Sequence, residues 1–270
     1  MMPLAHVAHH VGSTTRCGGS VLNQPAYCVD YTPRLPARPY CPQPGDIMLA
    51  TDHGWFWTYM HRLGRTGHPH HSGVVFQKPD GSMGILEAGP YGVWRVRILD
   101  AMDHLRGYEP RGVWIRQRKT PLTPEQSACL TAFALQADGK RFAIGRLGLQ
   151  LTPFRTRGPL RTAWVGKPQG ERRSYFCSEL ATEALVAAGL IDPEIARPSA
   201  TYPRDLFMDR SLNPYINRHF DLSCGWEPPA RWISDPECDR TFRPMFLGRA
   251  RPSREKENGA LIEGFERRPK

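Results

Sequence analysis

Residues 71–88 read HSGVVFQKPDGSMGILEA and carry the clearest structural signal of the chain. Two apolar runs, 72–76 and 83–88, flank the turn Pro79-Asp80-Gly81. A Pro-Asp-Gly turn between two apolar runs is typical of a β-hairpin. With the turn centred near Pro79, residue 87 lies opposite residue 72 or 73 on the partner strand. The sequence therefore predicts an antiparallel sheet built around this hairpin.

Three further segments predict strands beside the hairpin. Residues 47–50 form a short apolar run after a Pro-Gly-Asp turn, and residues 93–99 alternate between apolar residues and arginine. Residues 113–118 show a weaker alternation. Together with the hairpin, these segments predict an antiparallel sheet of about five strands. The aromatic-rich stretch 55–60 does not decide between helix and strand.

Two segments carry helix signals. Thr123 is an N-cap residue followed by proline and, three positions after the cap, by glutamine, so a helix is expected to run to about Ala137. Residues 177–188 place leucine and alanine on one face and end before Gly189, a C-terminal cap. The fold class predicted is α+β, with the sheet packed against helices.

The ends of the chain differ from its middle. Residues 1–43 are rich in proline and glycine and lack a period of 2 or 3.6, so a poorly ordered arm is expected. One ordered domain is predicted for residues 44–207. Residues 208–248 are expected to be an irregular extension, and residues 249–270 a charged, flexible tail.

The chain of 270 residues carries a formal net charge of +10, which favours anionic surroundings such as membrane head groups, cell-wall polymer or nucleic acid. No run of about 18 apolar residues that could span a bilayer is present. The first residues contain neither a basic leader nor a continuous apolar stretch for export. These features lead us to expect a soluble, cytoplasmic protein.

Seven cysteines occur without a Cys-x-x-Cys pair or a regular disulfide spacing, so reduced thiols are expected. Cys17, Cys28 and Cys41 lie in the leading segment, where a zinc site or a disulfide could form. Their spacing matches no known zinc-ligand pattern. We therefore expect no metal there.

Cys177 stands at the first turn of the second predicted helix. Unpaired backbone N–H groups and the helix dipole favour an anion at this position, and so lower the pKa of a thiol. A nucleophilic thiolate is the functional interpretation. The alternative is a small core residue, because Cys177 shares a helix face with Ala181 and Ala184, and free cysteines are often buried.

A nucleophilic thiol needs a base, and the base needs a group that fixes its tautomer. The hairpin brings His71 near Glu87, and a carboxylate beside an imidazole raises the basicity of the ring. Alternatively, His71 belongs to an exposed turn and Glu87 is a charge at the rim of the sheet. His68, His70 and His71 also suggest zinc ligands, but neighbouring residues rarely point at one ion. His68 and His70 are instead expected to face solvent or to line a pocket.

Several short motifs in this order resemble a known family, the permuted papain-like amidases of the NlpC superfamily, of the YiiX and YaeF type. The resemblance covers about residues 44–207. Its motifs are Pro44-Gly45-Asp46-Ile47, His71-Ser72-Gly73-Val74-Val75, Leu86-Glu87-Ala88, Gly139-Lys140-Arg141-Phe142, Tyr175-Phe176-Cys177-Ser178-Glu179-Leu180 and Tyr202-Pro203-Arg204-Asp205-Leu206.

The resemblance implies a papain-like core in circularly permuted order, with His71, Glu87 and Cys177 as a catalytic triad. The third member of such triads varies, and a backbone carbonyl or another polar residue could replace Glu87. The resemblance also places Tyr175 near the oxyanion site, although Tyr175 could equally pack beneath the helix. Trp55 and Trp57 could line an apolar substrate pocket or belong to the core.

The activity implied is that of a cysteine hydrolase, an amidase or peptidase or an acyl-ester hydrolase, acting through a thioester. Its substrate would be a cell-wall peptide or a lipid-linked acyl group. Neither an organic cofactor nor a metal is required, and an anionic membrane surface is a possible partner.

A non-catalytic binding module is the alternative function. Its basic surface would hold nucleic acid or an anionic membrane, although no nucleic-acid motif is present and arginines on strands usually form a solvated face. The residues proposed for this surface are Arg95, Arg97, Arg116, Arg118 and Lys119.

Overall fold

The structure of the chain is a computed structural model. It describes residues 20–23, 37–51, 59, 67–89, 94–146, 149, 152–208 and 222–234.

Within the described residues, ten strands form one mixed sheet in the order β2-β1-β10-β7-β3-β4-β5-β6-β8-β9. Neighbouring strands are antiparallel except β8 and β9, which are parallel. The strands are β1 (Val21–Asn23), β2 (Arg38–Pro39), β3 (Ile47–Ala50), β4 (His71–Gln77), β5 (Met83–Gly89), β6 (Arg95–Asp100), β7 (Val113–Arg116), β8 (Arg141–Phe142), β9 (Ser174–Tyr175) and β10 (Ala230–Ile233).

The prediction of about five strands is correct for the middle of the sheet and wrong for its extent. The five predicted segments are β3 to β7, and they lie side by side in the sheet. The five additional strands are two to four residues long. A segment this short cannot display a period of 2, so pattern alone does not reveal it.

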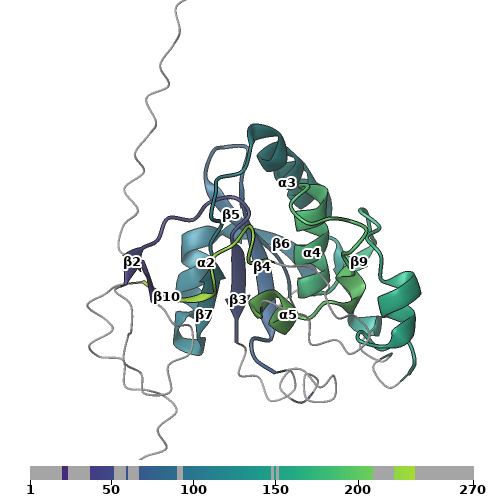
Figure 1. Cartoon of the computed structure of the whole chain (residues 1–270). Helices are drawn as coiled ribbons and strands as arrows, with labels where there is room; N and C mark the ends of the chain where they lie inside the picture. Colours follow the sequence, from purple (N-terminus) through teal and green to yellow (C-terminus); the bar gives the residue numbers. More distant parts are fainter. Residues whose placement is uncertain are drawn as a thin grey trace, which may run out of the picture.

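Helices cover both faces of the sheet (Figure 1). Helix α2 packs on one face of the sheet, and α3 and α4 pack on the other face. The α-helices are α2 (Ala101–Tyr108), α3 (Pro124–Ala137), α4 (Cys177–Ala187) and α5 (Pro203–Phe207). Short turns of 3₁₀-helix lie at Glu109–Arg111, Ile144–Arg146 and Pro198–Ala200, and a turn of π-helix lies at Arg161–Val165.

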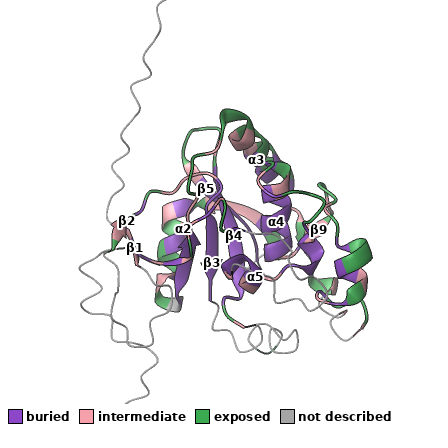
Figure 2. Cartoon of the chain, viewed as in Figure 1, coloured by how far each residue is buried: buried purple, intermediate pink, exposed green. Residues whose placement is uncertain are grey.

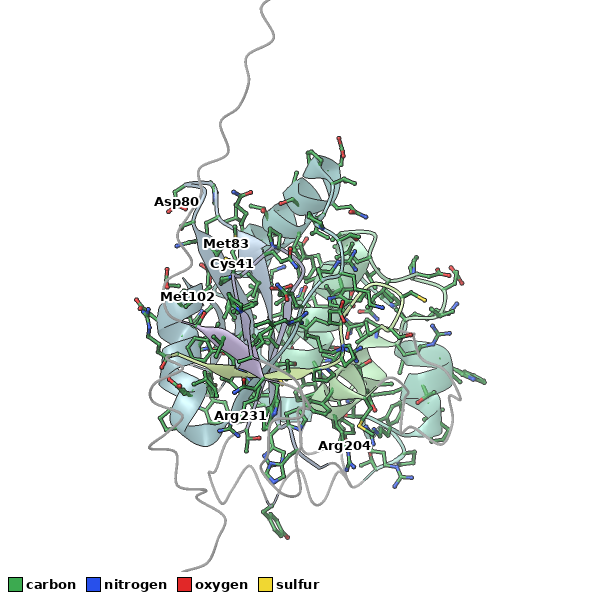
Figure 3. All side chains as sticks on the ribbon, turned by 60° about the vertical axis from the view of Figure 1, so that its left-hand side comes forward. Cys41, Asp80, Met83, Met102, Arg204 and Arg231 are labelled. Carbon is green, nitrogen blue, oxygen red and sulfur yellow. The ribbon has the colours of Figure 1, made fainter. Side chains whose placement is uncertain are left out.

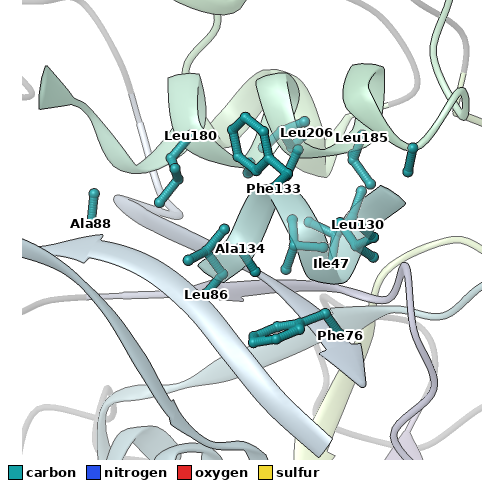
Figure 4. Close-up of a cluster of buried hydrophobic side chains, with 14 of the residues drawn as sticks. Ile47, Phe76, Leu86, Ala88, Leu130, Phe133, Ala134, Leu180, Leu185 and Leu206 are labelled. Carbon is teal, nitrogen blue, oxygen red and sulfur yellow. The ribbon is translucent and has the colours of Figure 1, made fainter. Parts of the chain in front are cut away.

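The larger part of the core lies between the sheet and the pair α3 and α4 (Figure 4). Leu130 and Phe133 from α3 and Leu180 from α4 pack onto Phe76 and Leu86 of the central strands. Each of these side chains is nearly or fully buried, and burying one apolar side chain of this size stabilises a fold by about 1.5–3 kcal/mol. This layer therefore holds α4, and the cysteine at its start, against β4 and β5.

Both predicted helices are confirmed together with their caps. Thr123 and Gln126 form a capping box at the start of α3. At the end of α4, the N–H of Gly189 donates to Val186 and that of Leu190 donates to Leu185, a Schellman motif. Gly189 has a φ of 68°, a conformation that glycine adopts without strain.

The described parts of the two terminal segments join the sheet, on both sides of the 44–207 span predicted as the ordered domain. Strand β1 pairs with both β2 and β10, and β10 pairs with β7. Leu22, Tyr40 and Trp232 are buried in the cluster on the α2 side of the sheet, and Figure 2 shows the buried residues concentrated in the central strands and α4. Short strands of this kind depend on partners distant in sequence, which composition does not show.

Cys41 is disulfide-bonded, which corrects the expectation of reduced thiols for this residue. Cys129, Cys177 and Cys224 form no disulfide. Cys17, Cys28, Trp55, Trp57 and the tail 249–270 lie outside the described residues. Among the described residues, no helix is both long and apolar enough to cross a membrane.

Candidate active site

The site forms where β4 begins and β5 ends, at the end of the hairpin away from its turn. Figure 3 shows Asp80 of the turn at the opposite end of the molecule from Arg204, whose side chain lies near Gly67, just before β4. Gly73 pairs with Glu87 across the hairpin, as predicted. His71, two residues before Gly73 and on the same side of the strand, is thereby brought to Glu87.

His71 and Glu87 are joined by a short hydrogen bond inside the protein. The distance from Nε2 of His71 to Oε2 of Glu87 is 2.6 Å, and the two residues are 4% and 0% exposed. The alternatives of an exposed histidine and a charge at the rim are therefore wrong. A carboxylate in this position fixes the orientation of the imidazole.

Two more donors hold the Glu87 carboxylate. Arg97, directly opposite on β6, donates from Nη2 to Oε1 at 3.2 Å. His104 of α2 lies with Nε2 2.8 Å from Oε2. Burial raises the pKa of Glu87, but the charges and hydrogen bonds of His71 and His104 outweigh it and hold the pKa well below its usual range.

His104 was not among the predicted site residues because α2 was not among the predicted helices. Two signals were present: Asp100 is a good N-cap, and its side chain accepts from the N–H groups of Met102 and Asp103. The buried residues Ala101, Leu105 and Tyr108 recur at helical spacing. The segment is eight residues long, however, and follows a strand directly, so its periodicity covers only two turns.

Cys177 begins α4, and its sulfur faces the start of β4. Sγ lies 4.0 Å from the carbonyl oxygen of His70. The backbone pairing between β4 and β5 ends at the Gly73–Glu87 pair. The backbone of His70 and Ser72 therefore lies outside this paired region. The N–H groups of Ser72 and Ser178 donate to the sulfur. The residue Cys177 is half-buried, whereas the residues that directly follow it on α4 are buried.

The imidazole of His71 bridges the carboxylate and the thiol. Because Nε2 faces Glu87, Nδ1 is the nitrogen available to Cys177. Burial lowers the pKa of His71, but the Glu87 charge and the hydrogen bonds to Cys177 and Glu87 raise it to about 10. Burial raises the pKa of the Cys177 thiol, but hydrogen bonding and the positive charge of His71 lower it below its ordinary value. This arrangement favours a thiolate beside an imidazolium.

Aromatic contacts surround the base. Tyr108 of α2 stacks on His71, with ring centroids 5.7 Å apart and planes inclined by 15°. The same tyrosine meets His104 edge-on at 5.0 Å. The tyrosine ring thus limits the orientations available to both histidines.

Tyr175 lies beneath the helices, as the packing alternative proposed. It is fully buried, and its ring meets Phe133 edge-on at 6.2 Å. Its hydroxyl donates to the carbonyl of Gly170 and accepts from the N–H of Arg172. These bonds direct the hydroxyl to the loop before β9.

Glu179, which was quoted only as part of a motif, supports the start of α4. Its carboxylate accepts from the N–H of Phe176 at 3.2 Å, from Arg146 at 2.7 Å and from the Ser199 hydroxyl at 2.8 Å. It is buried at 1% exposure. These bonds anchor the turn that carries Cys177.

His68 and His70 precede β4, next to His71. Their rings lie 4.1 Å apart, and His70 is buried while His68 is exposed. In the described part of the chain, no group of three or more His, Cys, Asp or Glu side chains is placed to hold a metal ion.

The basic residues of the binding-module alternative do not form one surface. Arg97 on β6 and Arg116 on β7 are separated by three strands, so they do not lie side by side in the sheet. Arg116 is fully buried and donates to the carbonyl oxygens of Leu206, Phe207 and Glu227. Arg95 donates to Gly139, Arg118 lies over the Trp226 ring at 4.4 Å, and Lys119 donates to Ser223.

Comparison with protein-family models found no match. Comparison with curated proteins found no match either. Among solved structures, the chain is distantly similar to the crystal structure of the metalloprotein YiiX from Escherichia coli O157:H7. The two share 16% sequence identity and a TM-score of 0.38, and the match covers 55% of this chain and 67% of that chain. A likeness of this size does not establish a shared fold.

Proposed function

We propose that the protein is a cysteine-dependent hydrolase with Cys177 as nucleophile, His71 as base and Glu87 as the group that orients the base. The observation that carries this proposal is the buried 2.6 Å hydrogen bond between His71 and Glu87, next to a thiol at a helix start. The order of His71, Glu87 and Cys177 along the chain also fits a permuted papain-like core.

The proposed reaction begins with the thiolate of Cys177 attacking the carbonyl carbon of an amide or ester. The imidazolium of His71 then gives its Nδ1 proton to the leaving nitrogen or oxygen as the bond to the acyl carbon breaks. Water, deprotonated by the neutral His71, next attacks the thioester and releases the acid and the thiolate. Glu87 stays ionised throughout and stabilises each imidazolium stage.

The start of α4 can also stabilise the developing oxyanion. The backbone N–H of Cys177 lies in the first turn of the helix, where N–H groups lack intrahelical partners. We assign this role to the backbone rather than to the Tyr175 hydroxyl, because that hydroxyl is hydrogen-bonded to Gly170 and Arg172.

We propose as substrate either a cell-wall peptide amide or a lipid-linked acyl group, as the motif resemblance implies. The two classes differ in the leaving group, an amine in the first case and an alcohol or amine of a lipid in the second. Purified protein incubated with cell-wall peptides and with acyl lipids, followed by mass spectrometry of the products, distinguishes them.

Thiol alkylation tests the proposed site without a known substrate. The protein is treated with iodoacetamide from pH 5 to pH 9, and labelling is read by peptide mass. Cys129 and Cys224 are exposed and form no disulfide, so they serve as references in the same chain. We expect Cys177 to label at least about tenfold faster than either at pH 6, because its thiolate persists below the ordinary thiol pKa.

His71→Ala is the matched variant. Removing the imidazolium should return the Cys177 labelling profile towards higher pH and leave Cys129 unchanged. Equal labelling of Cys177 and Cys129 in the wild type at pH 6 would contradict the proposal. A binding module for an anionic membrane would then be tested by the salt dependence of vesicle binding.

A further inference from the structure

The proposed triad leaves one buried contact of Glu87 unused. His104 comes from α2, on the α2 side of the sheet, and is brought to Glu87 by the packing of Ala101, Leu105 and Tyr108. The side chain of His104 is 14% exposed, and Nε2 lies 2.8 Å from the same oxygen, Oε2, that His71 contacts.

The carboxylate of Glu87 is faced by charged or titratable groups from β4, β6 and α2. His71 faces it from β4, Arg97 from β6 and His104 from α2. A carboxylate offers about four acceptor sites, so it accommodates all three donors. Arg97 contacts Oε1, while Oε2 is shared between the two histidines.

We propose that His104 is a positioning residue that acts through Glu87 to hold the His71 imidazole in the orientation needed to pair with Cys177. This inference rests on the proposed function. His104 does not contact the sulfur in this role. Its N–H fixes Oε2, and Tyr108, which contacts both rings, fixes the plane of His71.

Loss of the His104 donor should change the pairing of Glu87 with His71. With one donor fewer, the Glu87 carboxylate can rotate away from His71, which weakens the interaction that favours the imidazolium. The thiolate of Cys177 then loses part of its counter-charge. We therefore expect the pH midpoint of Cys177 labelling to rise when the donor at this position is lost.

Two amide substitutions separate a positioning role from a packing role. In His104→Gln the amide nitrogen can occupy the place of Nε2 and donate to Glu87, whereas in His104→Asn the side chain is one methylene shorter and cannot reach. Both replace an aromatic ring by an amide. Asp103→Asn, a change of an exposed carboxylate on the same helix, is the control for surface charge.

The experiment measures iodoacetamide labelling of Cys177 against Cys129 from pH 5 to pH 9, with the thermal midpoint of each variant. We expect labelling of Cys177 at pH 6 to fall about three- to tenfold in His104→Asn. His104→Gln should remain within about twofold of wild type. A packing role predicts instead that both amides lower the thermal midpoint without separating in their labelling profiles.

A second readout keeps the inference distinct from the proposed function. The titration of the His71 ring is followed by NMR of histidine nitrogens, and we expect its midpoint to fall in His104→Asn and to be retained in His104→Gln. If Cys177 is inert in the wild type, the proposed function fails while this titration still decides the role of His104. An unchanged His71 titration in His104→Asn overturns the inference.

Discussion

Two buried carboxylates, Asp46 just before β3 and Glu87 on β5, have the same exposure but pKa values shifted in opposite directions. Both residues are 0% exposed. Asp46 accepts from the N–H of Arg118 at 2.7 Å, the N–H of Gln43 at 3.2 Å and the Tyr40 hydroxyl at 3.0 Å. Burial raises the pKa of Asp46 to about 7 despite these bonds. The pKa of Glu87 is instead held well below its usual range.

The charge of each buried carboxylate therefore depends on its hydrogen-bond donors rather than on its depth of burial. The donors to Asp46 are neutral N–H and O–H groups, so they offset only part of the cost of burying the carboxylate. The donors to Glu87 are a guanidinium and two imidazoles, of which His71 is held cationic. Asp46 thus links segments of the sheet, whereas Glu87 maintains a charge pair beside a thiol.

The largest effect is expected for Glu87→Gln, which removes the charge and keeps the shape of the side chain. Without the carboxylate, His71 loses the charge that contributes most to its raised pKa. We expect labelling of Cys177 at pH 6 to fall about 10- to 100-fold. The free energy of unfolding at pH 7 should fall by about 3 kcal/mol, because Arg97 and His71 lose a buried partner.

The control for this variant is Asp46→Asn, which also neutralises a buried carboxylate. It should leave the ratio of Cys177 to Cys129 labelling unchanged. Equal loss of Cys177 labelling in both variants would mean that reactivity follows general destabilisation. The specific role assigned to the Glu87 charge would then be wrong.

An intermediate effect is expected on the pH dependence of stability. Folding raises the pKa of Asp46 from 3.8 to about 7. The contribution of Asp46 to the free energy of unfolding is therefore fully present below pH 3.8 and is lost as the pH rises through 7. The contribution is up to about 4 kcal/mol. Glu87 acts in the opposite sense: its contribution is present above about pH 4.5 and is lost at lower pH.

Urea unfolding of wild type, Asp46→Asn and Glu87→Gln at several values of pH between 3 and 6 measures how the free energy of unfolding changes with pH. This range lies below the ordinary pKa of histidine, so the titration of His71 does not contribute to the comparison. Relative to wild type, Asp46→Asn should lose less stability as the pH rises, and Glu87→Gln should lose less as the pH falls. Slopes that change in the same direction in both variants would refute the assignment of opposite charges.

The central fold was predictable because its signals are local. The Pro79-Asp80-Gly81 turn sets the register that pairs Gly73 with Glu87, and caps at Thr123 and Gly189 delimit α3 and α4. The outer strands were missed because each depends on a partner far along the chain. Strand β1, for example, pairs with β10 about 200 residues later, and neither segment alternates over enough residues to be recognised.

The site was predictable where it follows from the hairpin, and not where it depends on packing. His71 and Glu87 were placed together by strand register alone. His104 reaches Glu87 only because α2 folds back onto the sheet, and Arg116 is buried only because residues 206, 207 and 227 surround it. The resemblance of short motifs ordered the three proposed catalytic residues but carried no information on these contacts.

The smallest effect is expected for Tyr40→Phe, which removes the hydroxyl that donates to Oδ2 of Asp46 and keeps the buried ring. The hydrogen bond lowers the pKa of Asp46, so its loss should raise that pKa further. The variant should lose about 1 kcal/mol of unfolding free energy at pH 5, and more at pH 8, where the acceptor is ionised. In an Asp46→Asn background the same substitution should have no pH dependence, and a double-mutant cycle measured by urea unfolding isolates the pair. A pH-dependent loss that persists in that background would assign the effect to a group other than Asp46.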